Sequence, residues 1–309
     1  MKITALAGGV GGAKLAQGLK ELLSPEELKI IVNTGDDFWH LGLFICPDLD
    51  TVMYTLADIA NKRTGWGIQA DTFRTMSALE KLGRSEWFHL GDIDLATHLE
   101  RTRRIRAGES LTKITQELST ALGLRHRILP MTDQYVPTFV ETSEFGLIPF
   151  QEYFVKHHFS PKVNSFKFKD IEIANPTEEV LVSLNECDAV VICPSNPFVS
   201  IDPIIAIKGI KELLQKKLVV CVSPIVGGKA INGPLGKMFF ELGYDPNPLN
   251  IAKHYSDFLN VIYIDHKDHI YQNQISRFGI ICIESDIILP NIKERIRMAK
   301  QIIDYLKKK

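Results

Sequence analysis

The chain has no apolar run long enough to cross a lipid bilayer as a helix, which takes about 18 residues. The segment before the first glycines, MKITALA, is also too short for the apolar region of a secretory signal peptide. We therefore expect a soluble protein of the cytoplasm with no membrane partner.

An excess of charge of either sign is absent as well. Lys and Arg together number 36 and Asp and Glu number 37, so the formal net charge is −1. Proteins that bind nucleic acids or membrane surfaces usually carry a basic excess. The balance therefore argues against both kinds of partner.

Cysteine is scarce and is not arranged in pairs. The five cysteines include no CxxC motif and are Cys46, Cys187, Cys193, Cys221 and Cys282. An odd number at wide spacing is not typical of a disulfide framework or of a zinc site. We expect them to be small buried apolar residues.

What the sequence does contain is an alternation of strand and helix patterns over 309 residues. The clearest β-branched runs are Lys2–Ala7, Lys29–Asn33, Ala189–Cys193, Leu218–Ser223, Asn260–Asp265 and Gly279–Glu284. Helical spacing of apolar residues follows at Ala13–Leu23, Pro203–Gln215 and Asn291–Leu306. Strands that are apolar on both faces and alternate with helices predict an α/β fold with a doubly wound, mostly parallel sheet.

Helix starts are predicted at Ser24 and Asn175, because each is followed by proline and, two residues later, by glutamate. Residues 61–124 show helical patterns and no convincing strand, which predicts an all-helical insertion. The sheet domain would then comprise residues 1–60 and 125–309. Residues from about 126 to 174 alternate apolar and polar side chains between turn signals, which predicts extra antiparallel strands beside the main sheet.

The loop after the first predicted strand is rich in glycine and leads into a helix. It consists of Gly8, Gly9, Val10, Gly11, Gly12, Ala13 and Lys14. Glycines let a backbone approach a phosphate, and a helix N-terminus offers free N–H groups. The loop matches neither GxGxxG nor the Walker A pattern. It therefore predicts phosphate binding by Gly9, Val10, Gly11, Gly12 and Lys14, with a tight turn and no ligand as the alternative.

Two later loops lie at the same predicted edge of the sheet. Ser195 and Asn196 stand between two prolines, and Gly227 and Gly228 precede Lys229. Both loops are candidates for contacting a diphosphate. The alternatives are ordinary turn chemistry for the first loop and a flexible loop with a solvated lysine for the second.

Acidic residues gather twice near these loops. Asp36 and Asp37 follow the second strand, and Asp48 and Asp50 precede a helix that we expect to begin near Thr51. Carboxylates beside a phosphate favour a bridging Mg²⁺. Capping of the helix is the alternative for Asp48 and Asp50.

Other candidate residues have simpler explanations. A basic run, Arg101 to Arg106, falls on a predicted helix, so that most of its arginines should be solvated. Trp87 could stack on a flat ring, although a tryptophan packed in the core is more common. His98 is a lone histidine, for which a structural role is more common.

Nine segments, in order, resemble the 2-phospho-L-lactate transferase family of coenzyme F-420 biosynthesis. They are GGVGGAKLAQGL (8–19), VNTGDD (32–37), ICPDLDTVMYTLA (45–57), GWG (65–67), WFHLGDIDLATH (87–98), ILPMTD (128–133), FQEYFV (150–155), VICPSNP (191–197) and SPIVGGKAINGPLGKM (223–238). The resemblance runs nearly end to end and implies a Rossmann-like sheet with a small helical domain.

The resemblance also implies a reaction. A lactyl- or enolpyruvyl-diphospho-5′-guanosine would react with 7,8-didemethyl-8-hydroxy-5-deazariboflavin to give GMP and coenzyme F-420-0 or its dehydro form. Mg²⁺ would be the metal and a homodimer the assembly.

By the same resemblance, Asp50 and the position of His89 would contact the deazaflavin, although Arg or Lys is usual at the latter. Asp36 and Asp37 are the catalytic candidates, and Asp37 and Asp50 the candidate metal ligands. The sequence does not choose between Asp36 and Asp37 as base, or between the two donors.

Two rival functions differ from this one in specific segments. A nucleotide-sugar-binding regulatory protein of the same superfamily would lack the CPDLDT and WFHLGD segments found here. A nicotinamide-dependent oxidoreductase would need GxGxxG, with an acid about 20 residues further on. Asp36 is roughly in place for the second rival, but the glycine pattern is not.

Overall fold

The protein is built on a parallel sheet, as the sequence predicts, and this sheet has seven strands. The structure is a computed structural model that describes residues 1–84, 87–231 and 233–309. The strands run in the order β14-β13-β10-β9-β1-β2-β5. Their bounds are β1 Ile3–Ala7, β2 Leu28–Val32, β5 Arg127–Pro130, β9 Ala189–Ile192, β10 Leu218–Val222, β13 Val261–Ile264 and β14 Ile281–Glu284. The winding direction reverses between β1 and β9, which is where open α/β sheets bind ligands.

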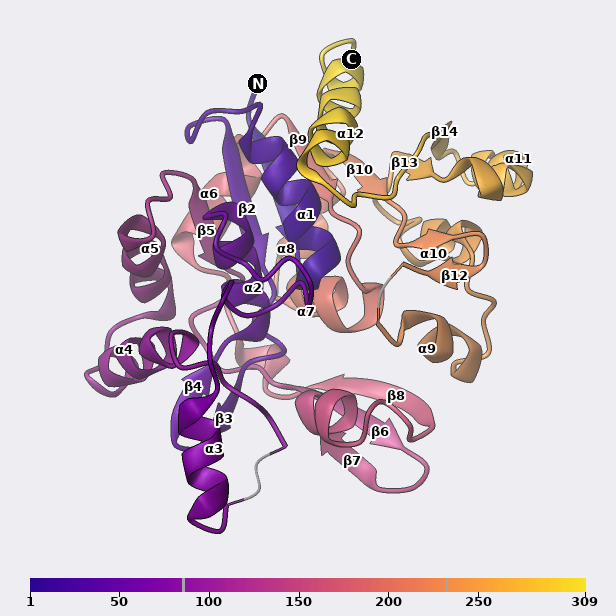
Figure 1. Cartoon of the computed structure of the whole chain (residues 1–309). Coiled ribbons are helices and arrows are strands. Elements are labelled where there is room, and N and C mark those ends of the chain that lie inside the picture. The colour runs from indigo at the N-terminus through magenta and orange to yellow at the C-terminus, as the bar shows by residue number, and fades with distance from the viewer. Residues whose placement is uncertain (85–86, 232) are drawn as a thin grey trace.

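Both faces of the sheet are buried, which explains why its strands are apolar throughout. Leu6 and Ile31 face one hydrophobic core, and Ala5 and Ile30 face the other. The helices that cover the first face are α6 (Glu178–Glu186), α7 (Asp202–Ala206), α8 (Ile210–Leu214) and α10 (Pro248–His254). Those that cover the second are α1 (Gly9–Lys20), α2 (Pro47–Leu56), α5 (Leu111–Ala121) and α12 (Ile292–Leu306) (Figure 1).

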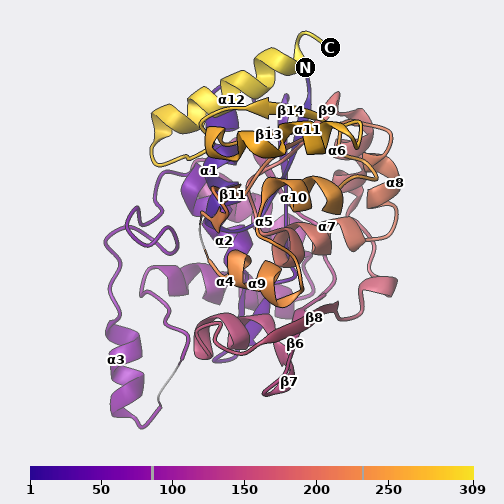
Figure 2. The same cartoon turned by 90° about the vertical axis from the view of Figure 1, so that its right-hand side faces the viewer.

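Smaller elements lie beyond the carboxyl ends of the strands. Figures 1 and 2 show two antiparallel sheets at the end of the molecule away from the chain termini. One is the hairpin of β3 (Phe38–His40) and β4 (Leu43–Ile45), and the other has the order β7-β6-β8. The bounds of the latter strands are β6 Thr138–Thr142, β7 Gly146–Pro149 and β8 Val163–Phe168.

Several further elements are short. They are β11 (Ile225–Val226), β12 (Lys229–Ala230), α9 (Leu235–Glu241), α11 (Gln272–Ser276), the π-helical turns η1 (Glu152–Lys156) and η3 (Pro197–Ile201), and the 3₁₀ turns η2 (Ile171–Ile173) and η4 (His266–Tyr271). In the described part of the chain, no helix is long and apolar enough to span a membrane.

Some local predictions were wrong. The stretch from 126 to 174 does form antiparallel strands, but its first strand, β5, joins the main sheet in parallel with β2. The hairpin at 38–45 was not predicted, because its strands have only three residues each. The pattern at 203–215 is split into α7 and α8, and Gly209 between them has a φ of +84°.

The two predicted helix starts also differ from the structure. After Ser24 the chain makes a single turn and enters β2 at Leu28, although the Ser24 N–H donates to Glu27 as in a capping box (3.0 Å). Helix α6 is capped by Thr177, two residues after the predicted Asn175; its Oγ1 accepts a hydrogen bond from the N–H of Val180 (3.2 Å). A capping motif therefore located a turn but did not fix whether a helix follows.

The stretch 61–124 contains α3 (Arg74–Lys81), α4 (Asp94–Arg106) and α5 in its described part. Two carboxylates join the starts of the first two helices. Asp92 accepts from the N–H of Thr75 at the start of α3 (2.9 Å), and Asp71 accepts from that of Asp94 at the start of α4 (3.0 Å). Helix α3 projects from the body of the molecule (Figure 2).

Candidate active site

Asn33, at the end of β2, organises the polar groups at the carboxyl edge of the sheet. Its Nδ2 lies 2.6 Å from Asp36 Oδ1, 2.9 Å from Asp48 Oδ2 and 3.1 Å from the carbonyl oxygen of Val199. An amide nitrogen carries two hydrogens, so these three acceptors share them. Asn33 thereby holds the β2 loop, the start of α2 and η3 together. No sequence motif predicts this role for Asn33.

The start of α1 is already in contact with protein acceptors. The N–H of Gly9 donates to Asp48 Oδ1 (2.7 Å) and the N–H of Gly8 donates to Ser195 Oγ (3.1 Å). Ser195 Oγ in turn donates to the Gly8 carbonyl oxygen (2.9 Å). A helix N-terminus favours anions, and here the carboxylate of Asp48 lies at it. Neither Asp48 nor Asp50 caps α2, which begins at Pro47.

The glycines of the first loop are required by close packing. A Cβ on Gly11 would lie 2.1 Å from the carbonyl oxygen of Pro194, and one on Gly12 would lie 2.4 Å from Ser195 Oγ. The loops after β1 and β9 therefore touch through glycine. Gly9, Val10 and Gly11 remain half-buried at the surface of this contact.

Gly11→Ala should destabilise the protein by about 1–3 kcal/mol, because the new methyl group meets backbone that cannot move aside cheaply. Urea unfolding followed by circular dichroism measures the change. Gly236→Ala is the matched control: its Cβ would lie 3.8 Å from Ala230, inside α9, where alanine is better than glycine by about 0.5–1 kcal/mol. Equal stability of the two variants would contradict the packing argument.

The other predicted phosphate loops have local structural roles. The side chain of Asn196 caps η3 by accepting from the N–H of Phe198 (3.0 Å). Gly227 and Gly228 form the two-residue turn of the β11–β12 hairpin, with φ of +56° and +74°. A turn with φ positive at both positions favours glycine whether or not a ligand binds. Phosphate contact by these residues stays a prediction.

Lys14 lies further along α1. It is half-buried, and burial, followed by the nearby Arg295 guanidinium, lowers the pKa of its ammonium group. No hydrogen bond or ion pair joins it to an acid among the described residues. Lys14 is therefore a cation whose charge is still available to an anion.

Three buried carboxylates lie close to one another here, and two of them, Asp36 and Asp48, accept from the Asn33 amide. Burial, followed by the neighbouring Asp48 carboxylate, holds the pKa of Asp36 well above its usual range. Burial raises the pKa of Asp48 to about 6, against the hydrogen bonds from Asn33 and Gly9. Burial likewise raises the pKa of Asp37. Such a group of acids costs free energy while it is ionised, and a bound cation would offset that cost.

Asp37 is the carboxylate best suited to a cation. Both of its oxygens are buried and have no hydrogen-bond partner. Within the described ranges, no three His, Cys, Asp or Glu side chains are placed as a complete metal-ligand set. Mg²⁺ does not need one, because it usually binds one or two carboxylates together with substrate phosphates and water. The residues present therefore fit Mg²⁺ at Asp37.

Asp50, the other predicted metal ligand, is engaged by Arg101. The Arg101 guanidinium donates to both Asp50 oxygens, one of them from Nη1 at 3.0 Å, and its side chain is 1% exposed. Asp50 can thus bind a metal or a deazaflavin only through the lone pairs that Arg101 leaves free, or by giving up this partner. The prediction that most of the basic run is solvated was wrong for Arg101 and for Arg104, which pairs with Glu109 (2.7 Å).

The Asp50–Arg101 pair is part of a longer buried network between α2 and α4. His98 Nδ1 lies 3.2 Å from Arg101 Nη1, and His98 Nε2 lies 3.3 Å from Asp94 Oδ2. The Tyr54 hydroxyl donates to Asp94 Oδ1 (2.7 Å). His98 therefore has the structural role expected of it. The network attaches α4 firmly beside the carboxylates.

An aromatic cavity of about 190 Å³ opens next to Asp36 and Asp37. Its aromatic lining residues are Phe38, Trp39, Trp87, Tyr135, Phe139 and Phe150. The rings of Trp87 and Phe38 are stacked, with centroids 5.9 Å apart. Gln151 lines the same cavity, and its Nε2 lies 3.4 Å from Asp36 Oδ2. A flat, mostly apolar molecule with a polar group at one end suits this lining.

Comparison with known proteins identifies the family. A family model described as 2-phospho-L-lactate transferase CofD matches residues 3–298. The 2-phospho-L-lactate transferase of Methanosarcina acetivorans is 39% identical over 298 residues, which are 96% of this chain and 97% of the relative. That of Methanocaldococcus jannaschii is 39% identical over 306 residues, or 98% and 97% of the two chains. The chain belongs to the 2-phospho-L-lactate transferase family. It is therefore a transferase.

Solved structures of low sequence identity share its fold. A protein of the UPF0052 family from Bacillus halodurans aligns with a TM-score of 0.64 at 15% identity, covering 98% of this chain and all of the other. A second structure of a protein from the same organism aligns with a TM-score of 0.62. At these identities the likeness shows the Rossmann-like architecture and carries no function.

The structure places His89 apart from the other predicted site residues. Its side chain is exposed, and its ring lies edge-on to Phe73 with centroids 6.4 Å apart. In the described parts of the chain, no hydrogen bond or ion pair joins His89 to Asp50. Its contact with deazaflavin stays a prediction.

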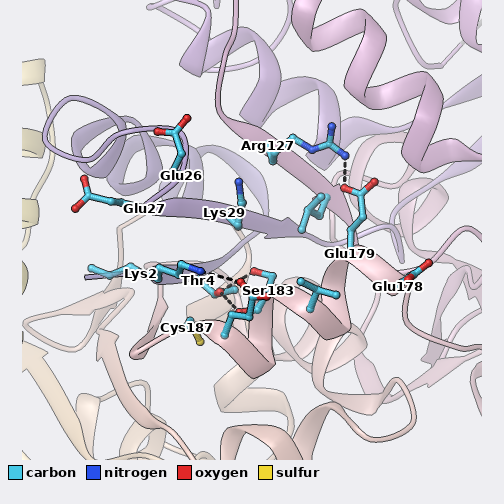
Figure 3. A pocket seen from close by; sticks show the side chains of 14 residues that line it. Lys2, Thr4, Glu26, Glu27, Lys29, Arg127, Glu178, Glu179, Ser183 and Cys187 are labelled. Carbon is cyan, nitrogen blue, oxygen red and sulfur yellow. Dashed lines mark hydrogen bonds and ion pairs between the residues drawn. The ribbon is translucent and has the colours of Figure 1, made fainter.

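A larger cavity, of about 360 Å³, lies at the other end of the strands, where β1, β2 and β5 begin. Among its charged side chains, Arg127 pairs with Glu179 (Figure 3) and Lys2 pairs with Glu186 (2.8 Å). The ammonium of Lys29 donates to the carbonyl oxygen of Pro25 (2.9 Å). This cavity is remote from the strand ends where ligands bind in such folds.

Proposed function

We propose that the protein joins the phospholactyl or phosphoenolpyruvyl group of a guanylated diphosphate donor to 7,8-didemethyl-8-hydroxy-5-deazariboflavin. The terminal hydroxyl of the ribityl chain attacks the phosphorus that bears the three-carbon acid. The bond from that phosphorus to the bridging oxygen breaks, and GMP leaves. The product is coenzyme F-420-0 or its dehydro form.

One observation supports this assignment above the others: Asp36 adjoins both halves of the site. Through Oδ2 it contacts Gln151 in the aromatic cavity, and through Oδ1 it contacts Asn33. Asn33 also donates a hydrogen bond to Asp48, and Asp48 accepts one from the first N–H of α1. A tricyclic alcohol in the cavity and a diphosphate at α1 would thus meet at Asp36.

Asp36 is accordingly the proposed general base. Burial, followed by the neighbouring Asp48 carboxylate, raises its pKa, so Asp36 holds a proton more readily than an ordinary carboxylate, as a general base must. The half-buried glycine loop and Lys14 are the proposed contacts of the diphosphate. Transfer of this kind depends mainly on positioning the groups and neutralising charge.

Mg²⁺ is part of the proposal. Asp37 would hold it together with phosphate oxygens of the donor, and when bound it would neutralise charge on the transferred group. The Cys46 thiol, and after it the Arg101 guanidinium, oppose the rise that burial causes in the pKa of the Asp37 carboxyl. A bound cation would likewise favour the ionised form of Asp37.

Mass spectrometry of the products, with the deazaflavin and each guanylated donor in turn, tests the function. We expect coenzyme F-420-0 or its dehydro form with equimolar GMP, loss of turnover in EDTA, and recovery with Mg²⁺. Absence of product with both donors would refute the transferase assignment. Full activity in EDTA would refute only the metal.

We also propose a homodimer, on the family resemblance alone. Sedimentation should then give twice the chain mass of 34.8 kDa. A mass equal to that of one chain would remove this part of the proposal and leave the reaction untouched.

A further inference from the structure

Gln151 is a buried amide in the aromatic cavity whose hydrogen bonding is incomplete. The residue follows Phe150 and directly precedes η1, and it is 5% exposed. Its Nε2 lies 3.4 Å from Asp36 Oδ2. No hydrogen bond between described residues uses its Oε1.

These contacts leave Gln151 able to bind a ligand. A separation of 3.4 Å is near the upper limit for a hydrogen bond, so the contact with Asp36 is weak. Gln151 Oε1 has no donor among the described residues and is not one of their fully buried unpartnered atoms, so it is open to a hydroxyl of a ligand in the cavity. Both polar atoms of Gln151 are thus available at the acidic end of the cavity.

We infer that Gln151 is a specificity-determining residue for the hydroxylated chain of the acceptor. Its Oε1 accepts a hydrogen bond from a secondary hydroxyl of the ribityl chain. Its Nε2 keeps its contact with Asp36 Oδ2, the oxygen that receives the proton of the terminal hydroxyl. This inference rests on the proposed function.

Because of its position, Gln151 contacts the ribityl chain of the acceptor and not its rings. Asp36 must reach the terminal hydroxyl, so a side chain within hydrogen-bond distance of Asp36 meets the atoms next to that hydroxyl. The rings pack against aromatic side chains such as Trp87 and Phe38 in the remainder of the cavity. An amide, which both donates and accepts, suits a polyol, whose hydroxyls do the same.

A pair of acceptors tests the inference. One is the natural deazaflavin, and the other carries a 5-hydroxypentyl chain in place of ribityl, so that it keeps the terminal hydroxyl and loses the secondary ones. We expect wild-type kcat/KM to favour the ribityl compound by about tenfold, in line with one buried hydrogen bond. Gln151→Met should bring the two values within about twofold by slowing only the ribityl reaction.

Gln116→Met is the matched control, because Gln116 is exposed on α5 and lies outside the cavity. It should keep the tenfold preference. An equal loss with both acceptors in Gln151→Met would overturn the inference and leave Gln151 a structural support of Asp36.

A wild-type enzyme that uses both acceptors equally would overturn the inference without any variant, and hence even if Gln151→Met does not fold. Failure of the wild type with both acceptors would refute the proposed function itself.

Discussion

Asp36→Asn should lower kcat by about 10²- to 10⁴-fold, the range usually lost with a general base. The substitution keeps the size of the side chain and an oxygen that can accept from Asn33, so the fold should persist. It removes the only oxygen that contacts both Gln151 and a substrate hydroxyl in the proposed arrangement. Single-turnover formation of the product, followed by chromatography with fluorescence detection, measures the loss.

Binding of the deazaflavin should survive in the same variant, because the aromatic walls of the cavity are unchanged. Asp170→Asn is a suitable control, since Asp170 is exposed in the turn before η2. If Asp36→Asn turned over within threefold of the wild type, the base would have to be another group, and Asp37→Asn would be the next variant to measure.

Arg101→Met should cost about 3–5 kcal/mol in the free energy of unfolding. The guanidinium is buried and pairs with both oxygens of Asp50, so its removal leaves a buried charge without a partner. The melting temperature should fall by roughly 5–15 °C in a protein of this size. Differential scanning calorimetry without ligands measures it.

Removing both partners should cost much less than removing one. The double variant Asp50→Leu with Arg101→Met replaces the ion pair by apolar side chains, a change that is often close to neutral. Arg103→Met is the surface control: its partner Glu100 is on the same exposed helix face, and pairs of that kind contribute about 0–1 kcal/mol. If the double variant were as unstable as Arg101→Met, packing and not charge would explain the loss.

Much of the fold could be predicted from local sequence patterns. Runs such as Ala189–Cys193 and Leu218–Ser223 are apolar apart from the final Ser223, and both became central strands. The same reasoning failed at β5, where Arg127 and Pro130 bound a strand of only four residues. Short segments carry too little periodicity to distinguish an edge strand of the main sheet from a separate hairpin.

The candidate site could be predicted from the sequence only in part. Asp36 and Asp37 were expected because they follow a strand, and the structure places both at one cavity. The roles of Asn33 and Gln151 were not expected. A single amide has no sequence signature, and Gln151 is 115 residues from the carboxylate that it contacts.

Asp50 shows most directly what could not be predicted from the sequence. Its spacing from Asp48 suggested a cap or a metal ligand, but its partner, Arg101, is 51 residues away on another helix. Helical periodicity gives the side of a helix on which Arg101 lies. It does not tell whether that side meets solvent or a buried acid.

The sequence by itself determined the order of strands and helices, the edge at which polar loops collect, and membership of a transferase family. Hydrophobic periodicity and contiguous motifs are local, and a single chain displays them directly. Only the tertiary structure decided which acid pairs with Arg101, which has oxygens free for a cation, and which faces the aromatic cavity. Those outcomes depend on contacts between segments far apart in the chain, where burial fixes the partners.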